Sequence, residues 1–302
     1  MNEKIRFEKP DIEKLKAEGL TCADMHFHTH YSDSYTQPKD ILRLAEKLGV
    51  GVAITDHNQV GGVLDAMEAN KDVMIIPGME ISASDGPHIL TYFYDWKDLK
   101  SFWESNIKDR IRECQWIALK DMPTPKLLDI LENENCIVSA AHPMGYLGSN
   151  KGLEVCIRKN YISKNEIGRF DAFEVISGGL FRGANLKASQ VAEEHNMGIT
   201  GGTDGHLLTE LGHIVTVSEA DSLDGFLDNI VKKRNKVIGI EKNLLTKAFM
   251  GLASLTEFCR QTPSVGFVQL DQTIMNFKRK MHPPVNNESE LAGGESADRN
   301  LE

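Results

Sequence analysis

Histidine and carboxylate side chains gather at a few points of the chain, and the first gathering is ADMHFHTHYSD, which contains His26, His28 and Asp33. In an extended strand alternate residues point to the same side, so the rings of His26 and His28 stand about 6–7 Å apart. Imidazole nitrogens and carboxylate oxygens are ligands for divalent transition metals. The spacing therefore predicts that both rings reach one ion, although an HxH pair alone also fits two polar residues at a strand end.

The same residue types return beside later apolar runs of the sequence. A lone buried histidine is more often a hydrogen-bonded core residue than a ligand. Several such residues at strand ends favour a metal site instead, because the C-terminal strand ends of a parallel barrel all open on one face. Nine nitrogen and oxygen ligands on that face suit two or three divalent ions. The later members are His57 in ITDHN, Glu80 in PGMEIS, His88 before ILTYFY, His142 in AAHP, and Asp204 and His206 in GGTDGH.

Short apolar runs alternate with amphipathic segments from residue 22 onward, which predicts a mainly parallel sheet, open or closed. Pro38 suits the first turn of a helix and Gly49 suits its C-terminal cap. The expected helices are 38–49, 63–69, 101–120, 126–133, 186–195 and 223–233. The expected strands are 23–28, 50–55, 73–77, 89–94, 137–141, 172–176 and 198–201, with 213–217 as an addition.

The length of 302 residues accommodates one α/β barrel with extensions. We expect residues 1–20 to form a short helical lead-in and residues 21–242 to form the barrel. Residues 243–282 are predicted as a helical extension, because 243–262 form an amphipathic pattern. Residues 283–302 are polar, acidic and rich in Gly and Ser, so we expect a disordered tail.

The amino-acid composition indicates which kinds of binding partner and which cellular compartment to expect. The chain has 44 acidic and 34 basic residues and a net charge of −10, so we expect no long duplex nucleic acid as a partner. A small phosphorylated substrate remains compatible, because bound cations reverse the local potential. Five scattered cysteines without CxxC favour a reducing cytoplasm. No window of about 20 apolar residues exists, so we expect no membrane span.

Other catalytic patterns have no support in the sequence, which contains no GxSxG, no Walker A loop and no Ser-His-Asp order. Arg182 in SGGLFRGA follows a predicted strand, and its planar guanidinium could bind a substrate phosphate. An ordinary ion pair with a surface acid explains Arg182 equally well. We carry Arg182 forward as the predicted substrate-binding residue.

The ordered motifs DMHFHTHYSD, ITDHN, PGMEIS, HILTYF, AAHP and GGTDGH together resemble the PHP superfamily (polymerase and histidinol phosphatase domains) over residues 22–217. The resemblance implies a distorted seven-stranded, TIM-like β/α barrel with a trinuclear site on its C-terminal face. It implies catalytic roles for Glu80, Asp204 and His206. The implied ligands are His26, His28, Glu80 and Asp204 for the first ion, Asp33, His57 and His206 for the second, and Glu80, His88 and His142 for the third.

The predicted protein is therefore a cytoplasmic phosphoesterase that uses two to three Mn, Fe or Zn ions and a metal-bridging hydroxide. Its expected substrate is a phosphate ester of a small molecule, a nucleotide or a short oligonucleotide. One alternative is a metal-dependent hydrolase of a carbon–nitrogen bond, and another is a non-catalytic binding domain of the PHP type. The sequence makes no prediction about the oligomeric state.

Overall fold

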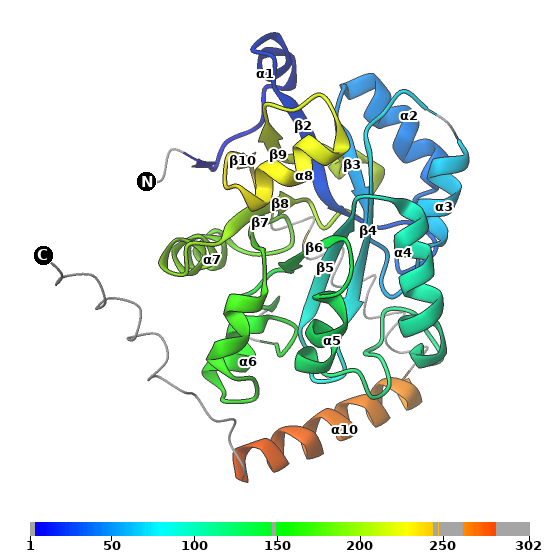
Figure 1. Ribbon diagram of the computed structural model, residues 1–302, viewed down its shortest axis with the longest axis vertical. Coiled ribbons are helices and arrows are strands. Elements are labelled where there is room, and N and C mark those ends of the chain that lie inside the picture. Colours follow the sequence, from blue (N-terminus) through cyan, green and yellow to red (C-terminus); the bar gives the residue numbers. More distant parts are fainter. Residues whose placement is uncertain (1–3, 70, 147–148, 244–246, 248–261, 282–302) are drawn as a thin grey trace, which may run out of the picture.

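The structure is a computed structural model that describes residues 4–69, 71–146, 149–243, 247 and 262–281. The described residues form one ten-stranded sheet in the order β1-β10-β9-β2-β3-β4-β5-β6-β7-β8. Figure 1 shows the sheet curving, with most helices on its outside. The strands are β1 (Ile5–Arg6), β2 (Thr21–Phe27), β3 (Gly51–Ile54), β4 (Ile75–Ser82), β5 (His88–Phe93), β6 (Cys136–Ala140), β7 (Ala172–Ser177), β8 (Gly198–Gly202), β9 (Ile214–Ser218) and β10 (Lys236–Gly239).

The helices alternate with these strands along most of the chain. Helix α2 buries Ile41, Leu42 and Ala45, and it ends at Gly49 in the left-handed conformation with φ of 68°, as its sequence predicts. The helices are α1 (Ile12–Ala17), α2 (Pro38–Leu48), α3 (Gly61–Glu68), α4 (Trp96–Phe102), α5 (Thr124–Leu131), α6 (Leu153–Arg158), α7 (Arg182–Glu194), α8 (Leu223–Val231) and α10 (Thr262–Met281).

The count of seven strands is not confirmed, because β1, β9 and β10 extend the sheet beyond β2. The region 213–217 was expected as an addition, and β9 occupies it. Strands β1 and β10 were not expected. The first has two residues and the second has four and begins with the exposed Lys236, so neither produces a recognisable apolar run.

The sheet is mixed rather than mainly parallel. Strand β5 runs antiparallel to both β4 and β6. Only residues 83–87 join β4 to β5, and a connection of five residues is too short for the crossover that a parallel pair needs. This reversal places His88, the first residue of β5, opposite Ser82, the last residue of β4. His88 thereby reaches the end of the sheet where β2, β3 and β6 finish.

The edge strand β8 folds back against the opposite part of the sheet, beside β2. Strand β8 contacts β2, β9 and β10. The backbone of His28 donates to the carbonyl of Gly205 at 2.9 Å, and Gly205 donates back to His26 at 3.2 Å. These two bonds connect the chain after β8 to the end of β2, so side chains at both places face one region.

Apolar side chains form two large clusters, one on each side of the strands. The inner cluster contains Met25, Tyr92 and side chains of α8, and the outer cluster contains Phe27 and the apolar faces of α2 and α5. Helix α8 therefore packs inside the curve of the sheet. Met25 and Phe27 belong to different clusters, because the register of β2 against β3 shifts between Asp24 and Phe27.

The helix expected over residues 101–120 is wrong. Helix α4 begins earlier, at Trp96, and helical turns end at Arg110. The following residues form a loop, because their carbonyl groups accept hydrogen bonds from side chains. The amide of Asn58 donates to Gln115 at 2.6 Å and to Ile117 at 3.1 Å, and Arg112 donates to Ala118 at 3.0 Å.

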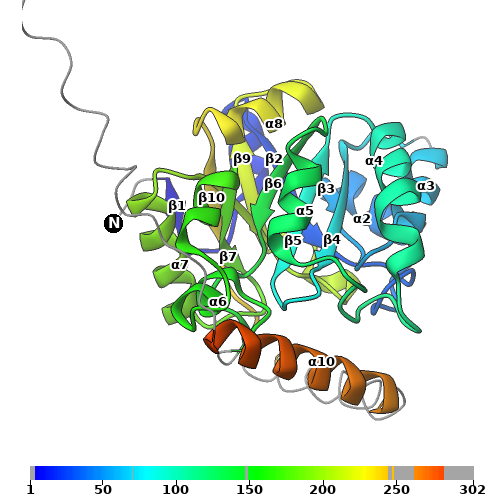
Figure 2. The ribbon, with the colours of Figure 1, turned by 60° about the horizontal axis from the view of Figure 1, so that its bottom comes forward.

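Helix α10 lies along one edge of the molecule, beside α6 in both views (Figures 1 and 2). Arg279 pairs with the buried Asp85 in the β4–β5 turn at 3.2 Å. Most of the expected helix 243–262 and all of the expected tail 283–302 lie outside the described residues. No helix in the described part of the chain is long and apolar enough to cross a bilayer.

Candidate metal centre

The nine residues singled out in the sequence lie together where β2, β3, β4, β6 and β8 end and β5 begins. His26 and Glu80 belong to strands, and His88 begins one. The others follow strand ends, within loops that start at His28, Thr55, Ala141 and Thr203. Residues between 26 and 206 in the sequence thus meet at one end of the sheet, which is where a curved α/β sheet keeps its functional groups.

Glu80 is the centre of this group and is 1% exposed. Its Oε1 lies 2.8 Å from Nδ1 of His88 and 2.9 Å from Nε2 of His142. Its Oε2 lies 3.0 Å from Nδ1 of His57. The same oxygen lies 3.4 Å from Nε2 of His26 and 3.5 Å from Nε2 of His28. One carboxylate therefore contacts five imidazoles.

Asp204 and Asp33 occupy opposite sides of His28. Oδ1 of Asp204 lies 3.2 Å from Nε2 of His28 and 3.6 Å from Nε2 of His26. Oδ1 of Asp33 lies 3.6 Å from Nδ1 of His28. Oδ2 of Asp33 lies 3.1 Å from Nε2 of His206 and 3.6 Å from Nε2 of His57. Every one of the nine side chains thus contacts at least one other.

These donors fit divalent metal ions in their kind and spacing. Three sets of ligand atoms each lie within 4.8 Å of one another. Neighbouring sets share His28 or His57, so they form a row, and Nδ1 of the buried His142 has no hydrogen-bond partner. The resemblance grouped Asp33 and His57 with His206, whereas the geometric set contains His28. The three sets are His26, His28 and Asp204; His28, Asp33 and His57; and His57, Glu80 and His88.

Burial and charge set the protonation of the group. Burial alone would raise the pKa of Glu80, but the neighbouring His57 and His88 hold it well below its usual value. Burial lowers the pKa of His57 to about 3 and that of His88 to about 4, so both rings are neutral at pH 7. Burial also opposes a charge on His206, but Asp33 outweighs it and raises that pKa to about 9. Ionised carboxylates and neutral imidazoles are the forms that bind metal.

Two further buried carboxylates hold the loops that carry the nine residues. Asp24 accepts hydrogen bonds from the backbone and hydroxyl of Thr203, at 2.9 and 2.7 Å, and from the backbone of Gly212 at 3.2 Å. Asp56 accepts from the backbone and hydroxyl of Thr29, at 2.7 and 2.6 Å, and from Ser32 at 2.7 Å. Burial raises the pKa of Asp24 to about 7 and shifts the pKa of Asp56 in the same direction.

The backbone is strained at two of the nine positions. His142 has φ of 26° and Asp204 has φ of 50°, and residues with a side chain rarely adopt such positive values. Strain of this kind persists where surrounding contacts fix it, and it concentrates at functional sites.

Glu174, Tyr146 and Lys242 are among the residues in contact with the group that were not anticipated. Glu174 of β7 contacts His26 at 2.9 Å, and its signal was available as a carboxylate inside the apolar run AFEVIS. The ring of Tyr146 lies tilted against that of His142, with ring centroids 4.8 Å apart, and its hydroxyl donates to Asp204. Lys242 donates to the Asp204 carbonyl at 2.7 Å. No sequence pattern indicates Tyr146 or Lys242, because the position of each depends on the path of the loop that carries it.

Arg182, predicted to bind substrate, begins α7 outside this group. Its guanidinium donates to both carboxylate oxygens of Glu241, at 2.6 and 2.8 Å, and lies 4.4 Å from the ring centroid of Phe7. None of the contacts described for Arg182 involves the nine residues. The role of Arg182 in substrate binding stays a prediction. The alternative interpretation was an ordinary ion pair with an acidic residue, and Glu241 is that residue.

Comparison with known proteins gives a family and a fold. The family model of the PHP domain matches residues 24–270. An uncharacterized protein of Methanocaldococcus jannaschii is 31% identical over 115 residues, which are 33% of this chain and 67% of that protein. A two-domain protein of Bacteroides vulgatus containing a predicted PHP-like metal-dependent phosphoesterase has a TM-score of 0.52 at 16% identity, covering 80% of this chain and 70% of that one.

A third similar structure corrects one expectation. Endonuclease Q in complex with a 27-mer duplex carrying an abasic lesion has a TM-score of 0.58 at 14% identity, covering 74% of this chain and 60% of that one. A protein with this fold therefore binds duplex DNA, and our exclusion of long duplex nucleic acid was wrong. Net charge averages over a whole chain, whereas DNA binding depends on the local charge that meets the phosphates.

Proposed function

The chain belongs to the PHP domain family, and from this premise we propose that it is a metal-dependent phosphoesterase whose nine-residue cluster binds two to three divalent ions. One observation carries the proposal, which is the contact of the buried Glu80 with five imidazoles. A buried carboxylate and five imidazoles at these distances have no value as a packed core, since burying polar groups costs free energy.

Divalent ions bound at such a cluster activate water at neutral pH and neutralise charge on phosphoryl oxygens. The protein's own residues fix the geometry. Nδ1 of His206 donates to the Asp204 carbonyl at 2.9 Å, which directs its Nε2 towards Asp33. The Asp24 and Asp56 hydrogen bonds keep the two loops that carry these residues in place, so little rearrangement is needed when substrate binds.

Substrate enters beside Asp33 and His206 in this proposal. Their side chains are 26% and 16% exposed, whereas those of His26, His28, Glu80 and His142 are at most 1% exposed. The ammonium of Lys242 lies at the same edge, where it donates to the Asp204 carbonyl at 2.7 Å and pairs with Glu210 at 3.2 Å. We propose a phosphate ester of a small molecule, a nucleotide or a short oligonucleotide as the substrate.

The test is a hydrolysis screen of the full chain loaded separately with Mn, Fe or Zn. The panel contains phosphomonoesters, nucleoside bisphosphates, oligonucleotides, duplex DNA with and without an abasic site, and amides. We expect phosphate ester cleavage that a chelator abolishes and Asp33→Asn lowers. Asp72→Asn, on the opposite end of the sheet, is the matched control and should leave the rate unchanged. Cleavage of amides without cleavage of any phosphate ester would overturn the proposal.

A further inference from the structure

Glu174 is a buried carboxylate that none of the proposed ion sets contains. It lies in the middle of β7 with 0% exposure, between Phe173 and Val175, which both pack in the outer apolar cluster. A carboxylate at such a position destabilises the fold unless each oxygen has a strong partner. Its partners therefore indicate its role.

Each oxygen of Glu174 holds a different histidine. Oε1 lies 2.9 Å from Nδ1 of His26, and Oε2 accepts the backbone N–H of His142 at 2.7 Å. Because a carboxylate only accepts, Nδ1 of His26 carries the proton in this bond, which leaves Nε2 as the ring nitrogen that can bind an ion. That Nε2 faces the cluster, 3.2 Å from Nε2 of His28 and 3.6 Å from Asp204. The second bond fixes the strained backbone of His142, whose Nε2 lies 2.9 Å from Glu80.

The two strands involved are irregular at these residues. The register of β2 against β3 shifts between Asp24 and Phe27, next to His26. The register of β7 against β8 shifts between Glu174 and Ile176. A bulge changes the side to which the next residues point, and bulges are frequent next to active sites. Both strands thus depart from regular pairing at the contact between His26 and Glu174.

We propose that Glu174 is a positioning residue that couples two of the proposed ion positions, the one at His26 and the one at His142. It fixes the tautomer and ring orientation of His26, and it fixes the backbone from which the His142 ring projects. The set of His28, Asp33 and His57 receives no hydrogen bond from it. The inference rests on the proposed metal-dependent function, and it predicts that losing one carboxylate weakens two positions and spares the third.

Metal titration of the full chain tests the coupling, with Mn²⁺ as the probe and the bound ions counted after dialysis. Glu174→Ala should weaken two positions by about 10–100-fold, the usual effect of removing a carboxylate behind a metal-bound histidine. Glu174→Gln should weaken them less, because its amide oxygen still accepts from His26 while its NH₂ group cannot accept from His142. Asp171→Asn is the matched control, since Asp171 precedes the same strand and accepts the backbone N–H of Val138 at 2.8 Å.

A second readout separates positioning from a merely structural role. Nitrogen-15 NMR of the metal-free protein, recorded over a pH range that reaches the neutral form of each ring, identifies the protonated ring nitrogen of each histidine. We expect Nδ1–H on His26 in the wild type, its retention in Glu174→Gln, and a mixture of tautomers in Glu174→Ala. Thermal unfolding in a chelator checks that all variants fold.

The outcomes are distinguishable. Wild-type affinity at every position in Glu174→Ala, or equal weakening of all positions, would overturn the coupling. A wild-type chain that binds no ion would overturn both proposals. A chain that binds ions, shows the Glu174 effect and cleaves no phosphate ester would refute the proposed function and leave the coupling standing.

Discussion

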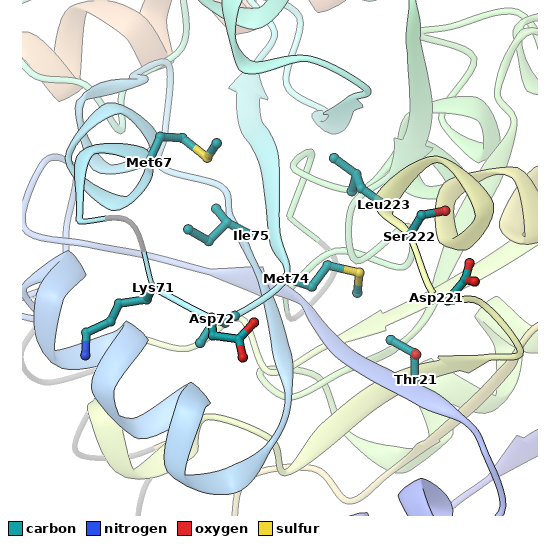
Figure 3. Close-up of a pocket in the computed structure, with 10 residues that line it drawn as sticks. Thr21, Met67, Lys71, Asp72, Met74, Ile75, Asp221, Ser222 and Leu223 are labelled. Carbon is teal, nitrogen blue, oxygen red and sulfur yellow. The ribbon is translucent and has the colours of Figure 1, made fainter.

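The two ends of the sheet treat polar side chains in opposite ways. At the end described above, carboxylates and imidazoles converge on one another, and all of them except Asp33 and His206 are almost fully buried. The other end holds a cleft of about 530 Å³ beside the first residues of β2 and β4 (Figure 3). There Lys71 pairs outward with Glu46 at 3.1 Å, and Thr21 donates to the backbone of Ala220. The comparison teaches that converging nitrogen and oxygen ligand atoms mark the chemical end of this molecule, which is the end that holds the nine residues.

The largest effect should come from removing the shared carboxylate. Glu80→Ala deprives five imidazoles of their common partner, so we expect bound metal to be lost and kcat/KM to fall by about 10³-fold, or about 4 kcal/mol. Metal analysis and steady-state kinetics measure both effects. Asp221→Ala in the cleft is the control and should change neither. Full metal occupancy with normal activity in Glu80→Ala would break the distinction between the two ends.

Removing the metal ions should lower the thermal stability of the protein, and this loss should depend only on the nine-residue group. An ion at 100 times its dissociation constant stabilises the folded state by about 2.7 kcal/mol. For a domain of this size we expect chelation to lower the melting temperature by about 5–10 °C. The shift should vanish in Glu80→Ala and persist in Asp72→Asn. A chelator effect of the same size in both variants would place the stabilising ion elsewhere.

Arg182 tests how far the chemical end extends. If it binds substrate, Arg182→Ala should raise KM or lower kcat/KM about tenfold, or about 1.4 kcal/mol, with metal content unchanged. Glu241→Gln is the informative companion, because it removes the ionic partner and leaves the guanidinium. A substrate role predicts that only the arginine variant loses affinity. Equal behaviour of the two variants would limit Arg182 to its ion pair.

The smallest effect on stability is expected from deleting residues 283–302. Residues 283–302 contain almost no apolar side chains that could be buried on folding. Their deletion should change the free energy of unfolding by no more than about 0.5 kcal/mol, the usual range for neutral surface changes. Denaturant unfolding of the shortened chain gives the value, and a clear loss of stability would contradict the prediction of a disordered tail.

Local sequence patterns predicted that the nine residues come together, because alternation in a strand and position at its end are short-range properties; their role as metal ligands stays a prediction. His26 and His28 meet as their spacing predicts. The sequence also predicted that His88 belongs to the group, but it did not predict the reason, which is that β5 runs in the opposite direction to β4 and β6. Whether a strand runs parallel or antiparallel depends on the length of its connection and on its neighbours, and the apolar run HILTYF is the same in both cases.

Other features were missed because they depend on contacts between distant residues. The helix expected at 101–120 has a helical pattern, but the amide of Asn58 binds carbonyl groups in its second half. Glu174 has one unusual property in the sequence, a charge within an apolar strand, and its partners lie 148 and 32 residues away. Strands β1 and β10 are too short for any pattern.

The hydrogen bonds between the end of β2 and Gly205 have a consequence for how the chain folds. His28 and Asp204, which these bonds bring together, are 176 residues apart in the sequence. Contacts of such separation form slowly, since a long loop must close before they give any stabilisation. The ion position at His26, His28 and Asp204 can exist only after that closure. We therefore expect ions to bind late during refolding, and to slow unfolding more than they accelerate folding.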